Sequence, residues 1–272
     1  MRKHATVAAV ASALALSAFV APGAAQADES VGDTEITKVV VNGGSNIVLG
    51  TTNPKTFTIA VTATDDSGIK EDYTFPVLWH GPGQKMPDDP YGLVIPDDVS
   101  GDCVAHSTTT TTCTFALTMN PQIDPQDNTT AGTWKVRASA SGNDWDYVSK
   151  DVAATVKVRR YAKLTVNASP EPVKKGKSLS VTGKLTRASW ETYKYAGYTG
   201  QPVKLQFRKK GTNTYTTVKT VTTGTGGALK TMVKAATDGY WRWSFAGTST
   251  TGTATGTATG TATGTADYVD VQ

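Results

Sequence analysis

The stretch Gly239-Tyr-Trp-Arg-Trp-Ser-Phe245 decides the fold class. Its apolar residues alternate with polar ones, with Trp241, Trp243 and Phe245 on one side and Arg242 and Ser244 on the other. This period of two places one face of a β-strand in a core and the other in water. The same alternation recurs in residues 179–185 and 203–208, and no long run with helical periodicity competes with it. The pattern predicts an all-β protein.

The runs divide into two groups of similar plan. About seven short runs follow residue 160, the usual number of strands in an immunoglobulin-like sandwich. The first half repeats the plan with two inward-facing sets, Phe57, Ile59, Val61 and Ala63, and Trp134, Val136, Ala138 and Ala140. We therefore expect two tandem immunoglobulin-like β-sandwiches after a cleaved signal peptide. Their ranges are 28–159 and 160–272, joined closely because no Gly, Pro or Ser linker separates them.

Residues 1–27 read as a secretory signal. Arg2 and Lys3 begin it, an apolar run follows, and Ala25-Gln26-Ala27 forms a small-residue cleavage site. The apolar run is shorter than the roughly 20 residues that a membrane span requires. The overall apolar fraction of 38% also excludes an integral membrane protein. We expect an extracellular protein with no membrane span.

Charge is divided unevenly along the chain. Residues 28–159 contain 18 acidic and nine basic residues, a net charge of −9, whereas residues 160–272 contain five acidic and 16 basic residues, a net charge of +11. Two domains with different surfaces are indicated. Halves of opposite sign can also attract each other, so self-association within or between chains is a further expectation.

The two cysteines, Cys103 and Cys113, are expected to form a disulfide, because exported proteins mature in an oxidising compartment. Closing this short loop is worth roughly 3 kcal/mol in the loop-entropy model. Comparing the two halves places about 19 extra residues in the first, around His80 to Thr112. Loops on rigid scaffolds concentrate binding residues, so this disulfide-containing insertion is a candidate contact region.

Residues 251–266 are four copies of Thr-Gly-Thr-Ala between the Trp241 run and the closing run at Asp267. The segment has no charge and no side chain larger than Thr, so it is expected to be a long hairpin loop that cannot order itself. Expansion of the repeat is the favoured origin, since lengthening a surface loop costs little.

No catalytic motif is present. The exported part offers His80 and His106 as bases, but no serine lies in a nucleophile elbow, and zinc and phosphate-loop motifs are lacking. No cofactor is therefore expected, except that calcium fits the aspartate-rich segments around residues 65–67 and 143–146, and above all Asp88, Asp89, Asp97, Asp98 and Asp102. Solvated turns are the alternative reading of these aspartates.

The basic half predicts a binding surface for polyanions. Lysines and arginines fall on or beside outward positions of its runs, and an aromatic loop near residue 193 adds ring surface. The candidate residues are Arg187, Trp190, Tyr193, Lys194, Arg208, Lys209, Lys210 and Arg242. An anionic cell-wall polymer or extracellular polysaccharide is the favoured partner, nucleic acid a less favoured one, and a merely soluble lysine-rich surface the alternative.

Four segments carry a resemblance to a known group of proteins: residues 180–187, 200–208, 238–242 and 267–271. Over about 110 residues they resemble the immunoglobulin-like repeat of secreted actinobacterial proteins of unknown function, and the first half is similar to a domain that often precedes it. The resemblance implies secretion and, in some members, calcium binding. It brings no catalytic residues.

Together these features favour a secreted, non-enzymatic binding or adhesion protein that contacts cell-envelope or extracellular polymers. A polysaccharide-active enzyme or accessory module is the first alternative, and it requires two carboxylates that face each other across a cleft. A calcium-binding protein is another. A protease inhibitor that presents the disulfide loop is the last, and it requires an exposed, rigid segment around His106.

Overall fold

The computed structural model describes residues 29–258 and 265–272. The described chain consists of β-strands, with four short 3-10 turns at Asn42–Gly44, Glu71–Tyr73, Asn128–Thr130 and Thr225–Gly227. The predicted signal peptide lies outside the described residues. Within them, no helix has the length and apolarity to cross a membrane. The prediction of an all-β fold is confirmed.

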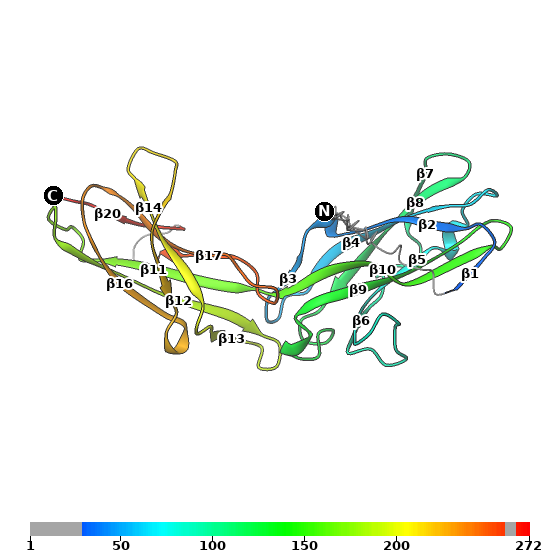
Figure 1. Cartoon of the computed structure of the whole chain (residues 1–272), viewed down its shortest axis with the longest axis horizontal. Helices are drawn as coiled ribbons and strands as arrows, with labels where there is room; N and C mark the ends of the chain where they lie inside the picture. The colour runs from blue at the N-terminus through cyan, green and yellow to red at the C-terminus, as the bar shows by residue number, and fades with distance from the viewer. Residues whose placement is uncertain (1–28, 259–264) are drawn as a thin grey trace, which may run out of the picture.

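The first sandwich consists of two sheets packed face to face (Figure 1). One sheet has the order β2 (Glu35–Val41), β4 (Lys55–Thr64), β8 (Thr110–Met119), β7 (Asp102–Ala105). The other has the order β1 (Glu29–Val31), β10 (Tyr147–Arg160), β9 (Gly132–Ser141), β5 (Phe75–His80), β6 (Gly92–Val94), with β3 (Ile47–Leu49) parallel to β10. These are the A-B-E-D and G-F-C orders of an immunoglobulin-like sandwich.

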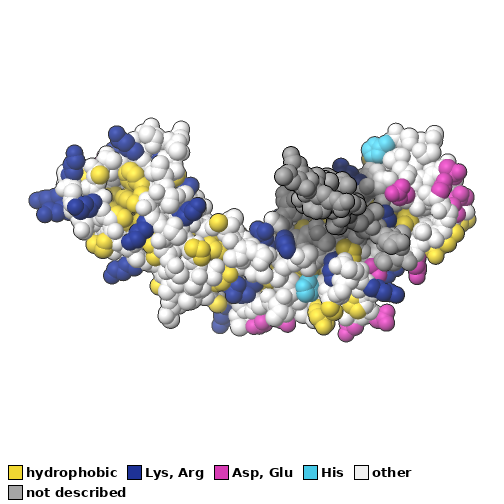
Figure 2. Space-filling view, in the orientation of Figure 1, with side chains coloured by type: hydrophobic (Ala, Val, Ile, Leu, Met, Phe, Trp, Pro, Cys, Tyr) yellow, Lys and Arg dark blue, Asp and Glu magenta, His cyan; other side chains and the backbone are white. Residues whose placement is uncertain are grey.

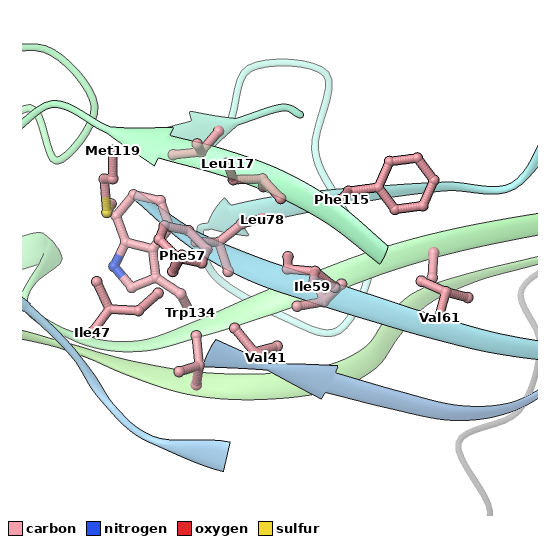
Figure 3. Packing of buried hydrophobic residues seen from close by; sticks show 14 of the residues in the cluster. Val41, Ile47, Phe57, Ile59, Val61, Leu78, Phe115, Leu117, Met119 and Trp134 are labelled. Carbon is pink, nitrogen blue, oxygen red and sulfur yellow. The ribbon is translucent and has the colours of Figure 1, made fainter. Parts of the chain in front are cut away.

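The core of the first sandwich follows from strand alternation. Phe57, Ile59 and Val61 of β4 are at most 4% exposed, and they meet the fully buried Trp134 of β9. Figure 3 shows these side chains in the space between the two sheets. The predicted disulfide between Cys103 and Cys113 is confirmed, and it joins residues directly opposite each other on β7 and β8. The supposed insertion around residues 80–112 therefore supplies two edge strands, β6 and β7.

The second sandwich has the same plan. β12 (Ser178–Ser189) pairs with β11 (Ala162–Ser169), β13 (Lys194–Gly197) and β16 (Ala228–Lys234). The facing sheet has the order β15 (Thr216–Thr222), β14 (Pro202–Lys209), β17 (Gly239–Phe245), β18 (Ala254–Thr255), and β20 (Asp267–Val269) also pairs with β17. Trp241, Trp243 and Phe245 are buried between the sheets, as the alternation predicts.

The Thr-Gly-Thr-Ala repeat begins inside the sandwich. Residues 254–255 form β18 against β17, and Thr257–Ala258 form β19, which pairs parallel with β11. Gly252 and Gly256 are buried and Thr253 and Thr255 are exposed, so the repeat itself has the alternation of a strand. A side chain at Gly256 would lie 3.3 Å from the backbone nitrogen of Trp243. The expectation of a loop unable to order itself is wrong for residues 251–258, because backbone pairing replaces the missing apolar area.

Only Tyr161 separates the last strand of the first sandwich from the first strand of the second. Trp190, which follows β12, is 1% exposed and belongs to the core of the first sandwich. Its indole N–H donates to the Gly50 carbonyl at 3.0 Å, and its backbone N–H donates to Asn128 Oδ1 at 3.0 Å. The second sandwich therefore inserts a side chain into the first, and the seam between them is fixed.

A buried guanidinium completes the seam. Arg160, the last residue of β10, is 7% exposed and donates from Nε to the Ala188 carbonyl. Burial, with the nearby positive charge of Arg187, lowers the pKa of Arg160 to about 10.

Replacing Trp190 with Ala tests the seam. We expect W190A to lower the free energy of unfolding by about 3–5 kcal/mol, because it leaves a cavity and an unsatisfied Gly50 carbonyl. Urea denaturation measures the loss. W145A is the matched control, because Trp145 is 59% exposed, and it should cost less than about 1 kcal/mol. Equal losses in the two variants would contradict the role assigned to Trp190.

Two carboxyl groups meet where the repeat returns to the sheet. Asp267 is 5% exposed, accepts from the backbone N–H of Ala168 at 2.6 Å, and shares a hydrogen bond with Glu171. Burial and the proximity of Asp267 raise the pKa of Glu171 to about 7, and burial also raises the pKa of Asp267. The folded protein therefore holds a proton here that the unfolded chain releases near pH 4.5.

This pair predicts a pH dependence. Because the native state binds the extra proton, stability should fall as the pH rises from about 4.5 to about 7. E171Q should flatten that decline, whereas E35Q, which changes an exposed glutamate of the first sandwich, should retain it. Urea unfolding across pH 4–8 measures both. An unchanged slope in E171Q would exclude the shared proton.

Candidate functional site

Four side chains on the outer face of β14, β17 and β20, together with Lys210 after β14 and Tyr215 before β15, combine three cations with three tyrosines. β14 contributes Arg208 directly opposite Tyr240 of β17, and Tyr240 lies directly opposite Tyr268 of β20. These positions face outward because their strand neighbours Trp241 and Val269 face the core. We call the set the cation–tyrosine ladder; its members are Arg208, Lys210, Tyr215, Tyr240, Arg242 and Tyr268.

The rings of the ladder hold its cations in place. The Arg242 guanidinium lies 3.6 Å from the centre of the Tyr215 ring, and the Arg208 guanidinium lies 4.0 Å from that of Tyr240. Tyr240 and Tyr268 have ring centres 5.1 Å apart, and Lys210 Nζ lies 5.4 Å from the Tyr268 ring. Contacts of this kind restrict the rotamers of long side chains, so the charges are positioned before a ligand arrives.

The two ladder arginines are not neutralised by carboxylates. Arg208 donates to the Thr212 carbonyl, and Arg242 donates from Nε to Gln206 Oε1 at 2.8 Å. Lys210 does form an ion pair, with Asp238 at 3.3 Å. Across residues 29–258 and 265–272, the only other ion pair is Arg137–Asp151. The two guanidinium groups therefore keep donors free for an external anion.

The hydrogen bond with Tyr215 raises the pKa of Arg208, and hydrogen bonds with Tyr268 and then Asp238 raise that of Lys210. Both groups stay charged at neutral pH. Figure 2 shows Lys and Arg gathered over the lobe of the second sandwich, at the left, and Asp and Glu over the first. The ladder therefore lies in a positive field that the other lobe does not share.

Four of the eight predicted polyanion residues lie on or beside the ladder: Arg208, Lys209, Lys210 and Arg242. Arg187 belongs to the other sheet and lies over the Tyr198 ring at 3.9 Å. Tyr193 and Lys194 are exposed near β13, and the Tyr193 hydroxyl donates to the Gln122 carbonyl at 3.4 Å. The structure thus separates these three residues from the ladder.

Trp190 requires a correction. It was expected on a binding surface, but it is buried in the seam, because its indole fills the core of the first sandwich. Three ladder members, Tyr215, Tyr240 and Tyr268, were not predicted. The alternation of Tyr240 with buried Trp241 could have placed one of them, but only strand pairing brings Tyr240 and Tyr268 together, and Tyr215 joins them through its contact with Arg242.

The five aspartates predicted for calcium do not converge within the described chain. Asp88 and Asp89 line a groove of about 320 Å³ with Leu93 and Asp124. The other three are spread over turns and an edge strand: Asp97 accepts from the backbone and hydroxyl of Thr118, Asp98 accepts from Ser100 N–H, and Asp102 lies in β7.

Other aspartate side chains do lie close together, at the end of the first sandwich that is away from the seam. Carboxylate oxygens of Asp33, Asp65 and Asp66 lie within 4.8 Å of one another, and so do those of Asp65, Asp144 and Asp146. Asp65 is 3% exposed and accepts from the Ser67 backbone at 2.9 Å, and from the hydroxyls of Ser67 and Thr34. Burial acts to raise its pKa, but these hydrogen bonds outweigh burial and hold the pKa below its usual value.

In its ionised form, the Asp65 carboxylate therefore ties its own turn to the loop that contains Thr34. We expect D65N to lower the free energy of unfolding by about 1–3 kcal/mol at pH 7. The difference should shrink as the pH falls below about 4, because the lowered pKa gives stability that protonation removes. Urea unfolding at pH 3–7 measures this, and D98N on an exposed turn is the control.

The calcium hypothesis stays a prediction. The unmodified protein and the D65N variant can be used to test it. Calcium held at Asp65 would raise the melting temperature of the unmodified protein and not that of D65N, whereas melting indifferent to a chelator would dismiss a structural ion.

The two histidines among the described residues, His80 and His106, have structural surroundings. His80 lies beside the Trp134 ring, with centres 5.4 Å apart, and burial lowers its pKa. His106 is exposed in the β7–β8 turn and shares a 2.9 Å hydrogen bond with Thr112. The exposed segment that a protease-inhibitor loop requires is thus present.

No protein family matches the sequence, and neither does any curated protein. Among solved structures, the chain is similar to the full ectodomain, Ig1–Ig3, of mouse nectin-like molecule 4, with 12% identity and a TM-score of 0.22. The match covers 90% of this chain and 65% of that one, so this chain spans less than two thirds of the ectodomain. The immunoglobulin-like assignment therefore depends on the strand order of the two sandwiches.

Proposed function

We propose that this chain is a secreted, non-enzymatic binding protein that holds an anionic cell-envelope or extracellular polymer on the cation–tyrosine ladder. One observation carries the proposal: Arg208 and Arg242 are fixed on tyrosine rings and lack a carboxylate partner among the described residues. An arginine in a folded protein commonly has a carboxylate partner. Binding a ligand to such an arginine costs free energy, because the existing ion pair must be desolvated. These two are free to pair with a ligand.

The shape of the ladder suits a polymer. The sheet is an open surface, and its cations lie on the neighbouring strands β14 and β17 and in the turn that follows β14. A guanidinium offers two parallel donors to a phosphate or carboxylate, and successive guanidiniums can contact successive anionic groups. A chain of repeating charges therefore fits better than a single small anion.

The charge of the other lobe favours a defined orientation. With a net charge of −9, the first sandwich repels the polymer that the second attracts. A bound polymer should therefore follow the second sandwich and leave the first available for other contacts.

Removing the ladder arginines tests the proposal. R208Q/R242Q should lower affinity for poly(glycerol phosphate) by about tenfold or more at low salt, because two positioned charge-assisted contacts are lost. The slope of log K against log salt should become shallower by about one per removed charge. Co-sedimentation with immobilised polymer across a salt series measures both, with neutral dextran as the reference.

K230Q/K234Q is the matched control, because it removes the same charge from exposed positions of β16, in the opposite sheet. It should change affinity by less than about threefold. Equal losses of affinity in the two double variants would show that binding depends on net charge and not on the ladder. Binding that ignores salt would exclude the electrostatic proposal altogether.

A further inference from the structure

A groove of about 280 Å³ lies at the seam between the two sandwiches. The first sandwich lines it with Val48, Gly50 and the segment Asn53-Pro54-Lys55, the connection contributes Tyr161, and β13 of the second sandwich contributes Tyr195. The groove therefore exists only when the sandwiches are docked. Interfaces between domains are a common place for small-ligand sites, because they form concave surfaces from rigid parts.

The lining combines exposed rings with positive charge. Tyr161 is 46% exposed, and its ring meets that of Tyr195 edge to face, with centres 6.4 Å apart and planes at 82°. Lys163 Nζ lies over the Tyr195 ring at 3.7 Å, and Lys55 lies in the lining itself. No carboxylate is among the described residues that line the groove. Its electrostatic preference is therefore for an anion.

The groove is built rigidly. The Tyr161 backbone N–H donates to the Leu49 carbonyl at 2.7 Å, and the adjacent Gly50 carbonyl accepts from Trp190 Nε1. A side chain at Gly50 would lie 3.3 Å from the Tyr195 hydroxyl, so glycine allows the close approach of that hydroxyl. Because these contacts anchor both aromatic residues, little ordering cost remains for binding.

A second groove, of about 440 Å³, shares Tyr161 with the first. Ala162 to Thr165 line it from β11, and the repeat lines it with Thr253 and with Ala254 and Thr255 of β18. Lys163 belongs to this lining too, so its ammonium group lies near both grooves. Two adjoining grooves around one aromatic residue offer room for two linked rings.

We infer that this seam groove binds a short acidic saccharide, of the uronic acid class. The apolar face of a pyranose ring packs on an exposed tyrosine ring, since both are flat and only partly polar. Its carboxylate is matched by Lys163 and Lys55, and its hydroxyls by the Asn53 amide and the tyrosine hydroxyls. The inference does not depend on the ladder, which lies on the other sheet of the second sandwich.

Short oligosaccharides of galacturonic acid, with two to four units, are the probe, and their methyl esters are the matched neutral ligands. Calorimetric titration of the signal-free chain should show binding of the acids, with the esters weaker by about tenfold or more because the charge-assisted contacts are lost. The indole N–H of Trp190 should shift in a nitrogen–proton NMR titration, because its acceptor Gly50 lines the groove. That of Trp145 should not.

Variants separate the groove from the ladder. Y161A should abolish measurable binding, and Y161F, which keeps the ring and controls for folding, should remain within about threefold of the unmodified protein. K163Q should weaken binding of the acids and leave the esters unchanged. R208Q/R242Q should bind the oligosaccharides normally, so failure of the ladder proposal would leave this result intact. Equal affinity for acids and esters, or an unshifted Trp190 indole at saturation, would overturn the inference.

Discussion

The position of Trp190 determines how the rest of the molecule is arranged. A connection of one residue, Tyr161, brings two sandwiches together, but a short connection alone leaves two bonds free to rotate. The indole of Trp190 removes that freedom by entering the core of the other sandwich and donating to the Gly50 carbonyl. Unlike a surface ion pair, this contact combines apolar burial with a satisfied hydrogen bond. The molecule is therefore an elongated pair of lobes with a fixed seam (Figure 1).

That fixed seam has two consequences for binding. It keeps the acidic and basic lobes apart, so their opposite charges do not cancel across a collapsed interface (Figure 2). It also creates the groove around Tyr161, whose lining comes from both sandwiches. The proposed polymer face and the proposed saccharide groove therefore depend on the same anchoring contact in different ways. The ladder requires a positive lobe, whereas the groove requires the docked geometry itself.

Much of the fold could be predicted because strand alternation is a local property. Phe57, Ile59 and Val61, and later Trp241, Trp243 and Phe245, are buried as their spacing indicates. The disulfide was also predictable, since a chain with two cysteines has one possible pairing. The order of the repeat was harder to predict. Its residues have little apolar area and are ordered by backbone hydrogen bonds to β17 and β11, and composition does not reveal such pairing.

By itself, the amino-acid sequence determined the all-β class, the period of each strand, the disulfide and the opposite charges of the two halves. Only the tertiary structure decided which outward residues meet. Tyr240 and Tyr268 are far from Arg208 in the chain, and strand register places Tyr240 opposite Arg208 and Tyr268 opposite Tyr240. Trp190 looked like a surface aromatic in sequence and is a core residue of the other sandwich. Alternation is set within one strand, whereas a site depends on long-range pairing, for which local spacing carries no signal.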